Sequence, residues 1–282
     1  MCMLAAAVAV GGCSQLVNLD GLVGPVDASA SDANITGDGG AGDDARDGAP
    51  DDAPDDARDD RGFCERSDAQ FCDDFDQPAR TVLASDGWTG LDMAAGGGSA
   101  IETALPRSLP RAAKFTWAAN VPTGAECHYA GLHREATVTG STIALAFAAW
   151  LGDAAGNLMP DDLLAHIAWG AADGTGCTVI WQSSPTGNEL REQATSMSDT
   201  THPLSAGQAS GAWHDYKMSV DLSTGSLGFT VDGRNAFAAP VQLRSACLHP
   251  FVRVSMSIGF YCASSNPLPA EVRFDNVTFS AR

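Results

Sequence analysis

Two acidic side chains, Glu189 and Glu192, form a candidate pair of catalytic carboxyl groups in the segment Asn188-Glu189-Leu190-Arg191-Glu192. Hydrolysis of a glycosidic bond needs two carboxyl groups about 5 to 9.5 Å apart around one sugar. Residues two or four apart in a strand meet that need. Glu189 and Glu192 are three residues apart, so in a strand they point to opposite faces. The spacing therefore argues against a glycoside hydrolase built on this pair.

Other patterns of catalytic residues are missing from the sequence. There is no Gly-x-Ser-x-Gly nucleophile elbow, and no cysteine and histidine pair of the kind used in nucleophilic catalysis. The histidines show no spacing typical of metal ligands, and we expect each of them to be solvated or hydrogen-bonded: His128, His133, His166, His202, His214 and His249.

An exposed aromatic side chain on a sheet could instead bind a sugar by stacking against its apolar face. Trp150 is the best candidate, because it is out of phase with the apolar residues of its own segment. Trp169 and Trp181 are in phase with apolar neighbours, so we expect them in the core. His166 and Gln182 lie on the opposite faces of those two strands. Trp150, His166 and Gln182 would form a glycan platform if they shared one concave face, and would otherwise be packing and rim residues.

Fold class follows from the period of the apolar residues, which is two from residue 63 onward. Segments 216–222 and 252–260 alternate apolar and polar side chains, and shorter alternating segments lie at 143–147, 163–169, 179–181 and 229–231. We find no convincing amphipathic helix after residue 63. About a dozen short strands separated by Gly-rich and Pro-rich turns predict one all-β domain, a two-sheet antiparallel sandwich.

Three segments of this domain resemble the concanavalin A-like, laminin-G-like jelly rolls, and the resemblance covers nearly all of residues 63–282. It implies a jelly-roll sandwich, in a superfamily of lectins, carbohydrate-binding modules, glycoside hydrolases and polysaccharide lyases. The fold does not choose among these activities. The segments are Phe71-Cys72-Asp73-Asp74-Phe75-Asp76 with Trp88, then Trp213-His214-Asp215-Tyr216 leading into Gly228-Phe229-Thr230-Val231-Asp232-Gly233, and Val272-Arg273-Phe274-Asp275-Asn276-Val277-Thr278-Phe279.

Within that superfamily the sequence favours no particular enzyme. The hydrolases carry Glu-x-Asp-x-Glu on a concave strand, and no such triplet occurs here. The run from Glu189 to Glu192 resembles the Glu-Leu-Arg-Glu core of one alginate lyase motif, which implies that Arg191 neutralises a uronate and makes Glu189 and Arg191 weak catalytic candidates. The Gln-x-His and Tyr-Lys-Ala-Gly segments of that family are absent, and His166 falls on the wrong side in chain order.

One structural calcium ion is the only cofactor we expect. The alternation of apolar residues breaks at Asp275-Asn276, as a β-bulge requires. First and last strands lie side by side in the resembled jelly rolls, and several members hold a calcium ion there. This arrangement would bring Asp275 near Asp73, Asp74 and Asp76, whose oxygens suit Ca²⁺. The alternative is that Asp275 pairs with an arginine or accepts backbone N–H bonds.

Cysteine usage predicts an oxidising compartment and three disulfides. Six cysteines remain after Cys2 and Cys13 are set aside with the N-terminal segment, and no C-x₂₋₄-C spacing suggests zinc. Fifteen connectivities are possible. Short closures favour Cys64 with Cys72 and Cys247 with Cys262, which leaves Cys127 with Cys177.

The N-terminus predicts a lipid anchor. Residues 3–10 form an apolar run too short to span a bilayer as a helix, and they are typical of a signal peptide. Val10-Gly11-Gly12-Cys13 resembles the bacterial lipobox, which implies a signal peptide at 1–12 and a lipidated Cys13. Ser14 resembles the sorting pattern for the outer membrane. We therefore expect the cell envelope or surface of a Gram-negative bacterium, and the alternative is an ordinary buried cysteine.

Residues 13–26 would then be the anchor and an N-terminal tail, and residues 27–62 a disordered linker rich in Asp, Ala and Pro. From 27 to 61 there are 12 Asp and 3 Arg, or a charge of 3 − 12 = −9, with too few apolar side chains to offset chain entropy. Residues 63–282 contribute 13 − 22 = −9. Such a charge repels phosphate backbones, so we expect no nucleic-acid partner.

These observations favour a membrane-anchored, lectin-like lipoprotein that binds a polysaccharide or another glycan without catalysis. The alternatives are a polysaccharide lyase or glycoside hydrolase on the same fold, and a structural or protein-binding surface module.

Overall fold

The structure is a computed structural model of the chain. It describes residues 62–77, 80, 83, 87–104, 106–108, 110–120, 129–138, 140–152, 163–171, 175–184, 187–195, 197–205, 211–248, 251–261 and 269–282. The expected signal peptide, anchor and linker lie outside these residues, apart from Gly62 at the end of the linker. Among the described residues, no helix has the length and apolar character needed to cross a membrane.

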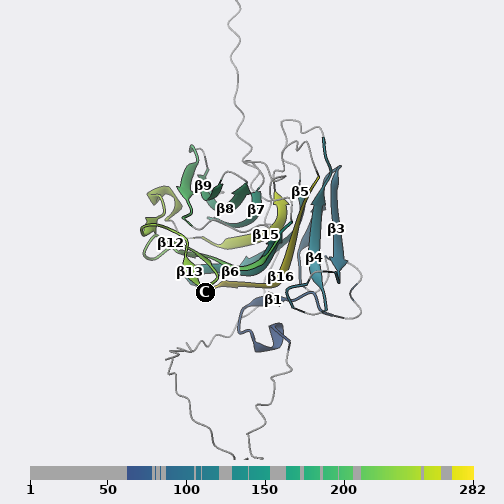
Figure 1. The fold of residues 1–282 in the computed structure, drawn as a ribbon. Coiled ribbons are helices and arrows are strands. Elements are labelled where there is room, and N and C mark those ends of the chain that lie inside the picture. The colour runs from purple at the N-terminus through teal and green to yellow at the C-terminus, as the bar shows by residue number, and fades with distance from the viewer. Residues whose placement is uncertain are drawn as a thin grey trace, which may run out of the picture.

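Two antiparallel sheets form the described part of the chain, as the alternation predicts (Figure 1). Sheet A has the order β13-β12-β11-β6-β16-β4-β3, with β1 paired to β16 and β14 to β12. Its strands are β1 (Phe71–Asp73), β3 (Gly97–Glu102), β4 (Ala112–Trp117), β6 (Thr142–Leu151), β11 (Trp213–Asp221), β12 (Ser226–Val231), β13 (Arg234–Asn235), β14 (Val241–Gln242) and β16 (Ala270–Ala281).

Sheet B has the order β10-β9-β8-β7-β15-β5-β2. Figure 1 shows it curved, with β9 and β5 rising on either side of β7 and β15, so its outer face is the concave one. Its strands are β2 (Gly90–Met93), β5 (Tyr129–Thr137), β7 (Leu163–Gly170), β8 (Gly176–Ser184), β9 (Gly187–Ala194), β10 (Thr200–Pro203) and β15 (Arg253–Tyr261), and the described helices are the short 3₁₀ turns η1 (Cys64–Arg66) and η3 (Ser245–Cys247).

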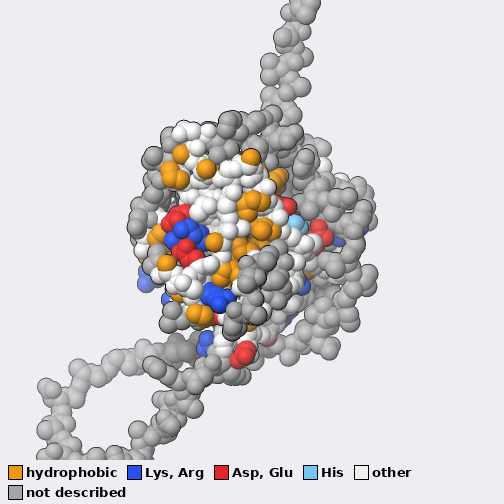
Figure 2. All heavy atoms as spheres, turned by 90° about the vertical axis from the view of Figure 1, so that its right-hand side faces the viewer, with side chains coloured by type: hydrophobic (Ala, Val, Ile, Leu, Met, Phe, Trp, Pro, Cys, Tyr) orange, Lys and Arg blue, Asp and Glu red, His pale blue; other side chains and the backbone are white. Residues whose placement is uncertain are grey.

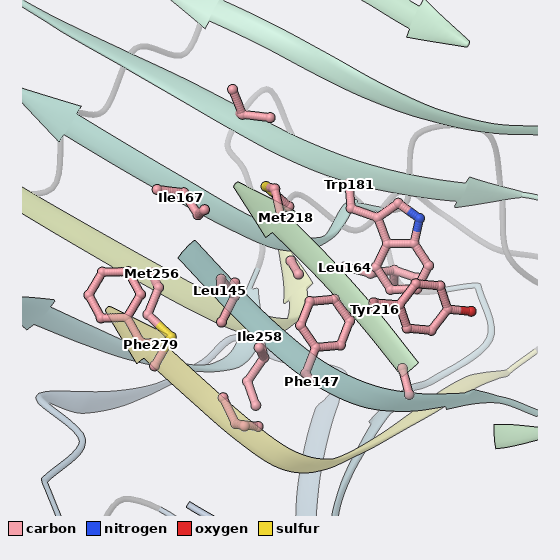
Figure 3. Close-up of a cluster of buried hydrophobic side chains, with 14 of the residues drawn as sticks. Leu145, Phe147, Leu164, Ile167, Trp181, Tyr216, Met218, Met256, Ile258 and Phe279 are labelled. Carbon is pink, nitrogen blue, oxygen red and sulfur yellow. The ribbon is translucent and has the colours of Figure 1, made fainter. Parts of the chain in front are cut away.

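Aromatic side chains from both sheets meet between them and form the centre of the core (Figure 3). The Trp181 ring of sheet B lies 4.5 Å from the Tyr216 ring and 5.6 Å from the Phe147 ring of sheet A, measured between centroids. Trp181 and Trp169 are fully buried, which confirms their expected place in the core. Because side chains alternate along each strand, burial of these residues assigns their polar neighbours to the outer face of sheet B.

Two disulfides join described cysteines, and one of them corrects a predicted pairing. Cys64 pairs with Cys72, as expected. Cys177 pairs with Cys247, 70 residues away, so the expected pairs Cys127 with Cys177 and Cys247 with Cys262 are wrong. The prediction assumed that cysteines close together in the sequence pair with each other. In the structure the turn η3 instead lies against the start of β8, and the Trp169 indole N–H donates to the Cys247 carbonyl. Cys127 and Cys262 lie outside the described residues.

We predict that three disulfides form, with Cys127 and Cys262 making the third pair. Peptide mapping under non-reducing conditions should recover all three pairs, and titration of the denatured, unreduced protein should find no free thiol in the domain. Two free thiols assigned to Cys127 and Cys262 would contradict the prediction.

The two observed disulfides should differ in their contribution to stability, because they close chain segments of 70 and 8 residues. On the loop-entropy relation, the double variant Cys177→Ala/Cys247→Ala should lose about 4 kcal/mol of unfolding free energy. The matched variant Cys64→Ala/Cys72→Ala should lose about 2.5 kcal/mol. Denaturant titration measures both losses, and the reverse order would exclude this explanation.

Candidate functional site

The outer face of sheet B carries a row of five side chains, four of them polar, that crosses five strands. Strand register places Arg191 of β9 opposite Ile180 of β8, Ile180 opposite His166 of β7, His166 opposite Ser257 of β15, and Ser257 opposite His133 of β5. Residues opposite one another on neighbouring strands are about 5 Å apart. The row therefore brings Arg191, His166 and His133 onto one surface, although 58 positions of sequence separate the first from the last.

His166 is the most buried titratable group of this face. It is 4% exposed, and its Nδ1 has no hydrogen-bond partner among the described residues. Burial lowers the pKa of His166 to about 4, and the charge of nearby His133 adds to the decrease. The ring is therefore neutral at neutral pH. The histidine was expected to be solvated or hydrogen-bonded, and its Nδ1 is neither of these among the described residues.

Tyr261 packs against His166, with 4.5 Å between ring centroids. It also meets Tyr129 of the neighbouring strand at 5.0 Å, in an edge-to-face arrangement. A bulge in β15 between Ile258 and Tyr261 allows this contact. Gly259 lies in the bulge with φ of +114°, and a Cβ there would come within 2.4 Å of the Ala130 carbonyl oxygen. Glycine is therefore required for β15 to approach β5 this closely.

His133 forms a hydrogen bond with a carboxylate at the other end of the row. Its Nδ1 lies 3.0 Å from a carboxylate oxygen of Asp92 in β2. A Cβ on Gly90, the residue opposite His133, would overlap the imidazole ring. The ring thus occupies the space that a side chain at position 90 would take, and Asp92 fixes its orientation.

Gln182, Glu189 and Arg191 form the other half of the face. Gln182 is 4% exposed, and within the described part of the chain its Oε1 has no hydrogen-bond partner. It lies opposite Glu189, on the outer face of β8. An Arg191 nitrogen lies 3.8 Å from a Glu189 carboxylate oxygen and 3.9 Å from one of Asp199. The structure thus confirms that His166 and Gln182 share a face, and it adds both lyase candidates, Glu189 and Arg191, to that face.

Glu192 points the other way, as its spacing from Glu189 predicts. Its side chain is buried and accepts hydrogen bonds from the Arg244 backbone N–H and from His202. The two carboxyl groups lie on opposite faces of β9, so they cannot act on one sugar.

Trp150 does not belong to this site, which corrects the expected platform of Trp150, His166 and Gln182. Trp150 lies in β6 of sheet A, and the other two lie in sheet B. The indole is 6% exposed because the Arg273 guanidinium covers it at 4.1 Å. Trp150 was out of phase with the core because it packs on the outer face of sheet A, under a salt-bridged arginine.

Arg273 belongs to a charged cluster on that face, made of Glu102, Lys114, Glu271 and Arg273. Lys114 pairs with both glutamates at 3.2 and 2.9 Å, and Arg273 pairs with the same two. Figure 2 looks onto the side of the molecule where β3 and β4 lie, and shows basic and acidic side chains gathered together there. The cluster neutralises itself and holds three strands of sheet A together.

The predicted bulge at Asp275-Asn276 is confirmed, and β1 pairs with β16 beside it. Asp275 is fully buried and accepts hydrogen bonds from the backbone N–H groups of Arg107 and Ser108 at 3.1 and 2.8 Å. Burial raises the pKa of Asp275 to about 7, and its hydrogen bonds oppose the rise. Acceptance of backbone N–H bonds was the alternative to a metal site.

The calcium prediction for Asp73, Asp74, Asp76 and Asp275 finds no support in side-chain geometry. The Asp73 carboxylate is committed to a salt bridge with buried Arg80 at 2.7 Å and to the Trp88 indole. Among the described residues, no three His, Cys, Asp or Glu side chains are arranged to hold a metal ion. Calcium binding stays a prediction.

Sequence reasoning missed Tyr129, Tyr261, His133 and Asp92 as site residues. A signal for Tyr261 was present, because it continues the polar phase of Arg253, Ser255 and Ser257 in β15. The other three come from β2 and β5, and only the register across the sheet brings them to this face.

Comparisons with solved structures identify the fold. The described architecture is similar to an endo-β-1,4-glucuronan lyase from the fungus Trichoderma reesei, at 15% identity and a TM-score of 0.57, over 76% of this chain and 96% of the other. It is also similar to the cellulose-induced protein Cip1, at 14% identity and a TM-score of 0.53, over 76% of this chain and 98% of the other. No family profile and no curated protein matches the sequence. These likenesses show the jelly-roll fold.

Replacement of Asp275 should test both readings of the bulge. Asp275→Ala leaves the backbone N–H groups of Arg107, Ser108 and Asn276 without their acceptor, so the free energy of unfolding should fall by about 1 to 3 kcal/mol. Asp221→Ala is the control, because it removes an exposed carboxylate from a turn of the same sheet.

Thermal melts with and without a calcium chelator complete the test. If Ca²⁺ binds here, the chelator lowers the Tm of the wild type by several degrees and leaves Asp275→Ala unchanged; a wild-type Tm indifferent to chelator and to added Ca²⁺ contradicts calcium binding.

Proposed function

We propose that this domain is a polysaccharide lyase that cleaves a uronate-containing glycan by β-elimination. The observation that carries the proposal is the buried imidazole of His166. It has an unpartnered nitrogen, it is neutral, and it lies against a tyrosine on the concave face of sheet B. An unpaired buried polar atom costs free energy, and a ligand bound on this face would supply the missing partner. The fold shared with a glucuronan lyase supports the same class of chemistry.

β-Elimination needs three catalytic roles, and the described residues can fill each of them. Binding of the uronate carboxylate by a cation or hydrogen-bond donor makes the C5 proton more acidic, a base removes that proton, and an acid protonates the departing oxygen. The C5–H bond breaks, its electron pair forms the C4=C5 double bond, and the C4–O bond to the leaving sugar breaks. No water is consumed.

Each catalytic role is assigned to one or two residues of the site. Neutral His166 takes the C5 proton, and the Tyr261 hydroxyl protonates the leaving oxygen. Arg191 and Gln182 bind the carboxylate. Arg191 and His166 are two strands apart, about 10 Å, so a sugar lying over β8 reaches both. Gln182 lies diagonally between them, and its unpartnered Oε1 can accept a sugar hydroxyl.

A hydrolase is less well supported by the same surface. Glu189 and Glu135 are four strands apart, about 19 Å. Asp92 and Glu135 are on neighbouring strands but are displaced along them by about 13 Å. Neither of these separations lies within the range of about 5 to 9.5 Å that hydrolysis needs. Glu189 and Asp199 lie closer together, but both carboxylates are paired with Arg191.

Cleavage is measured through the ultraviolet absorbance of the unsaturated uronate that elimination creates. We expect the wild-type domain to produce it from a uronate-containing polysaccharide. His166→Ala and Tyr261→Phe should each lower kcat about 10²-fold to 10⁴-fold, because each removes a proton-transfer group. His214→Gln is the matched control, since His214 pairs with Asp232 on sheet A and should leave the rate unchanged.

The pH profile tests the role of His166 separately. Its lowered pKa means that the ring loses its proton at about pH 4, so kcat/KM should fall only as the pH drops through about 4. An acid limb near pH 6.5 would contradict the assignment. If the protein binds glycans on an array without cleaving them, and Gln182→Ala weakens binding, a lectin-like function replaces the lyase.

We also propose that the protein is anchored to the cell envelope by lipid on Cys13. The lipobox-like Val10-Gly11-Gly12-Cys13 supports this proposal, and the acidic segment 27–62 would hold the domain away from the membrane. Cys13→Ser should abolish palmitate labelling and release the protein from the membrane fraction. Cys2→Ser is the control and should change neither. Labelling that survives Cys13→Ser would exclude the anchor.

A further inference from the structure

The distribution of basic side chains limits which glycan the concave face can accept. Residues 63–282 contain 16 − 3 = 13 Lys and Arg, because three Arg lie in the segment 27–61. All 13 are among the described residues. Three of them, Arg134, Arg191 and Arg253, lie in strands of sheet B. Arg134 is next to His133, so it points to the inner face, where it stacks on Phe71. Arg191 and Arg253 are therefore the two that point to the outer face.

Both cations of the face are already matched by carboxylates. Arg191 lies between Glu189 and Asp199, at 3.8 and 3.9 Å. Glu135 lies near Arg253: burial raises the pKa of Glu135, and the charges of His133 and Arg253 oppose the rise. Asp92 adds a further carboxylate at the β2 edge, beside His133. The described part of the outer face therefore has more acidic than basic side chains.

Residues between 62 and 282 that the structure does not describe cannot reverse this balance through Lys or Arg, because they contain none. Their sequence holds six acidic residues, Asp86, Glu126, Asp153, Asp161, Asp162 and Asp173. The whole domain carries 13 − 22 = −9. A glycan with a carboxylate on every sugar would meet a surface of its own sign, which slows association and costs binding free energy.

A single uronate fits the same surface well. Arg191 is the one cation within reach of a sugar that also contacts His166, and the neighbouring side chains on that half of the face are uncharged or acidic. The side chains opposite Arg191 on β8 and next to it on β9 are Ile180, Gln182, Thr178 and Gln193. These side chains suit the hydroxyl groups and apolar faces of neutral sugars.

We propose, on the basis of the lyase function above, that the substrate is a heteropolysaccharide in which each uronate is flanked by uncharged sugars. A homopolymer of uronates is a poor substrate. Glu189 and Asp199 enforce this preference by repelling the carboxylates of adjacent sugars, while Arg191 binds the carboxylate of the sugar that is cleaved.

Two polymers of the same linkage test the proposal: a (1→4)-linked polyglucuronate, and a polymer in which glucuronate alternates with a neutral sugar. We expect kcat/KM for the alternating polymer to be at least tenfold higher. Added salt should raise the rate on polyglucuronate by screening repulsion and leave the alternating polymer nearly unaffected. A preference for polyglucuronate, with a rate that salt lowers, would overturn the proposal.

Charge variants identify the residues responsible. Asp199→Asn removes one repulsive carboxylate and should raise severalfold the ratio of kcat/KM on polyglucuronate to kcat/KM on the alternating polymer. Asp215→Asn is the matched control, because it removes the same charge from an exposed position on sheet A. If both variants act alike, net charge rather than the site sets the preference, and the assignment to Asp199 is wrong.

Binding separates failure of this inference from failure of the lyase function. Affinity electrophoresis of the His166→Ala variant in gels containing each polymer measures binding without turnover. Retardation by the alternating polymer alone, without cleavage by the wild type, refutes the lyase but keeps the charge preference. Cleavage of both polymers at equal rates keeps the lyase and refutes the preference, and retardation by neither polymer refutes both.

Discussion

Burial of Trp181 between the two sheets fixes the orientation of four polar side chains of the candidate site. The indole contacts Phe147 and Tyr216 of sheet A and is fully buried. Its strand partners on either side, Ala165 and Leu190, must then face the core as well. The residues beside these three, His166, Gln182, Glu189 and Arg191, are turned to the concave face. A register slip of one residue would place a histidine and an arginine in the core and a tryptophan outside, so the large cost of exposing that ring protects the site geometry.

Two breaks in strand regularity adjust the side-chain directions that the alternation sets. The shift between Ile258 and Tyr261 in β15 brings the tyrosine ring onto His166, and a regular strand would leave it one position away. The bulge at Asp275-Asn276 in β16 turns a carboxylate toward the backbone N–H groups of Arg107 and Ser108. Each irregularity occurs where a side chain must be aimed at a particular partner, which is the usual role of a bulge.

The sequence was a good guide to features set by local pattern. Period-two alternation predicted the sandwich and the buried Trp169 and Trp181, and a break in it predicted the bulge at Asp275. Features set by pairing between distant strands were harder to predict. Cys177 lies 70 residues from its partner, and Trp150 has the phase of a surface residue but is covered by an arginine of another strand. Tyr129 and His133 reach the site only through the register of β5 with β15. No local pattern carries that register.

The short strand β1 has a mechanical consequence. The disulfide from Cys64 to Cys72 ties the first described residues directly into β1, and β1 pairs with β16, which lies inside sheet A between β6 and β4. Tension applied to the chain at residue 62 therefore passes through the sulfur bridge into β1, and the segment between the two cysteines carries little of it. The pull then acts on the pairing of β1 with β16, which spans three positions of register, so this short ladder is the part of the sandwich that bears a load from the N-terminal side.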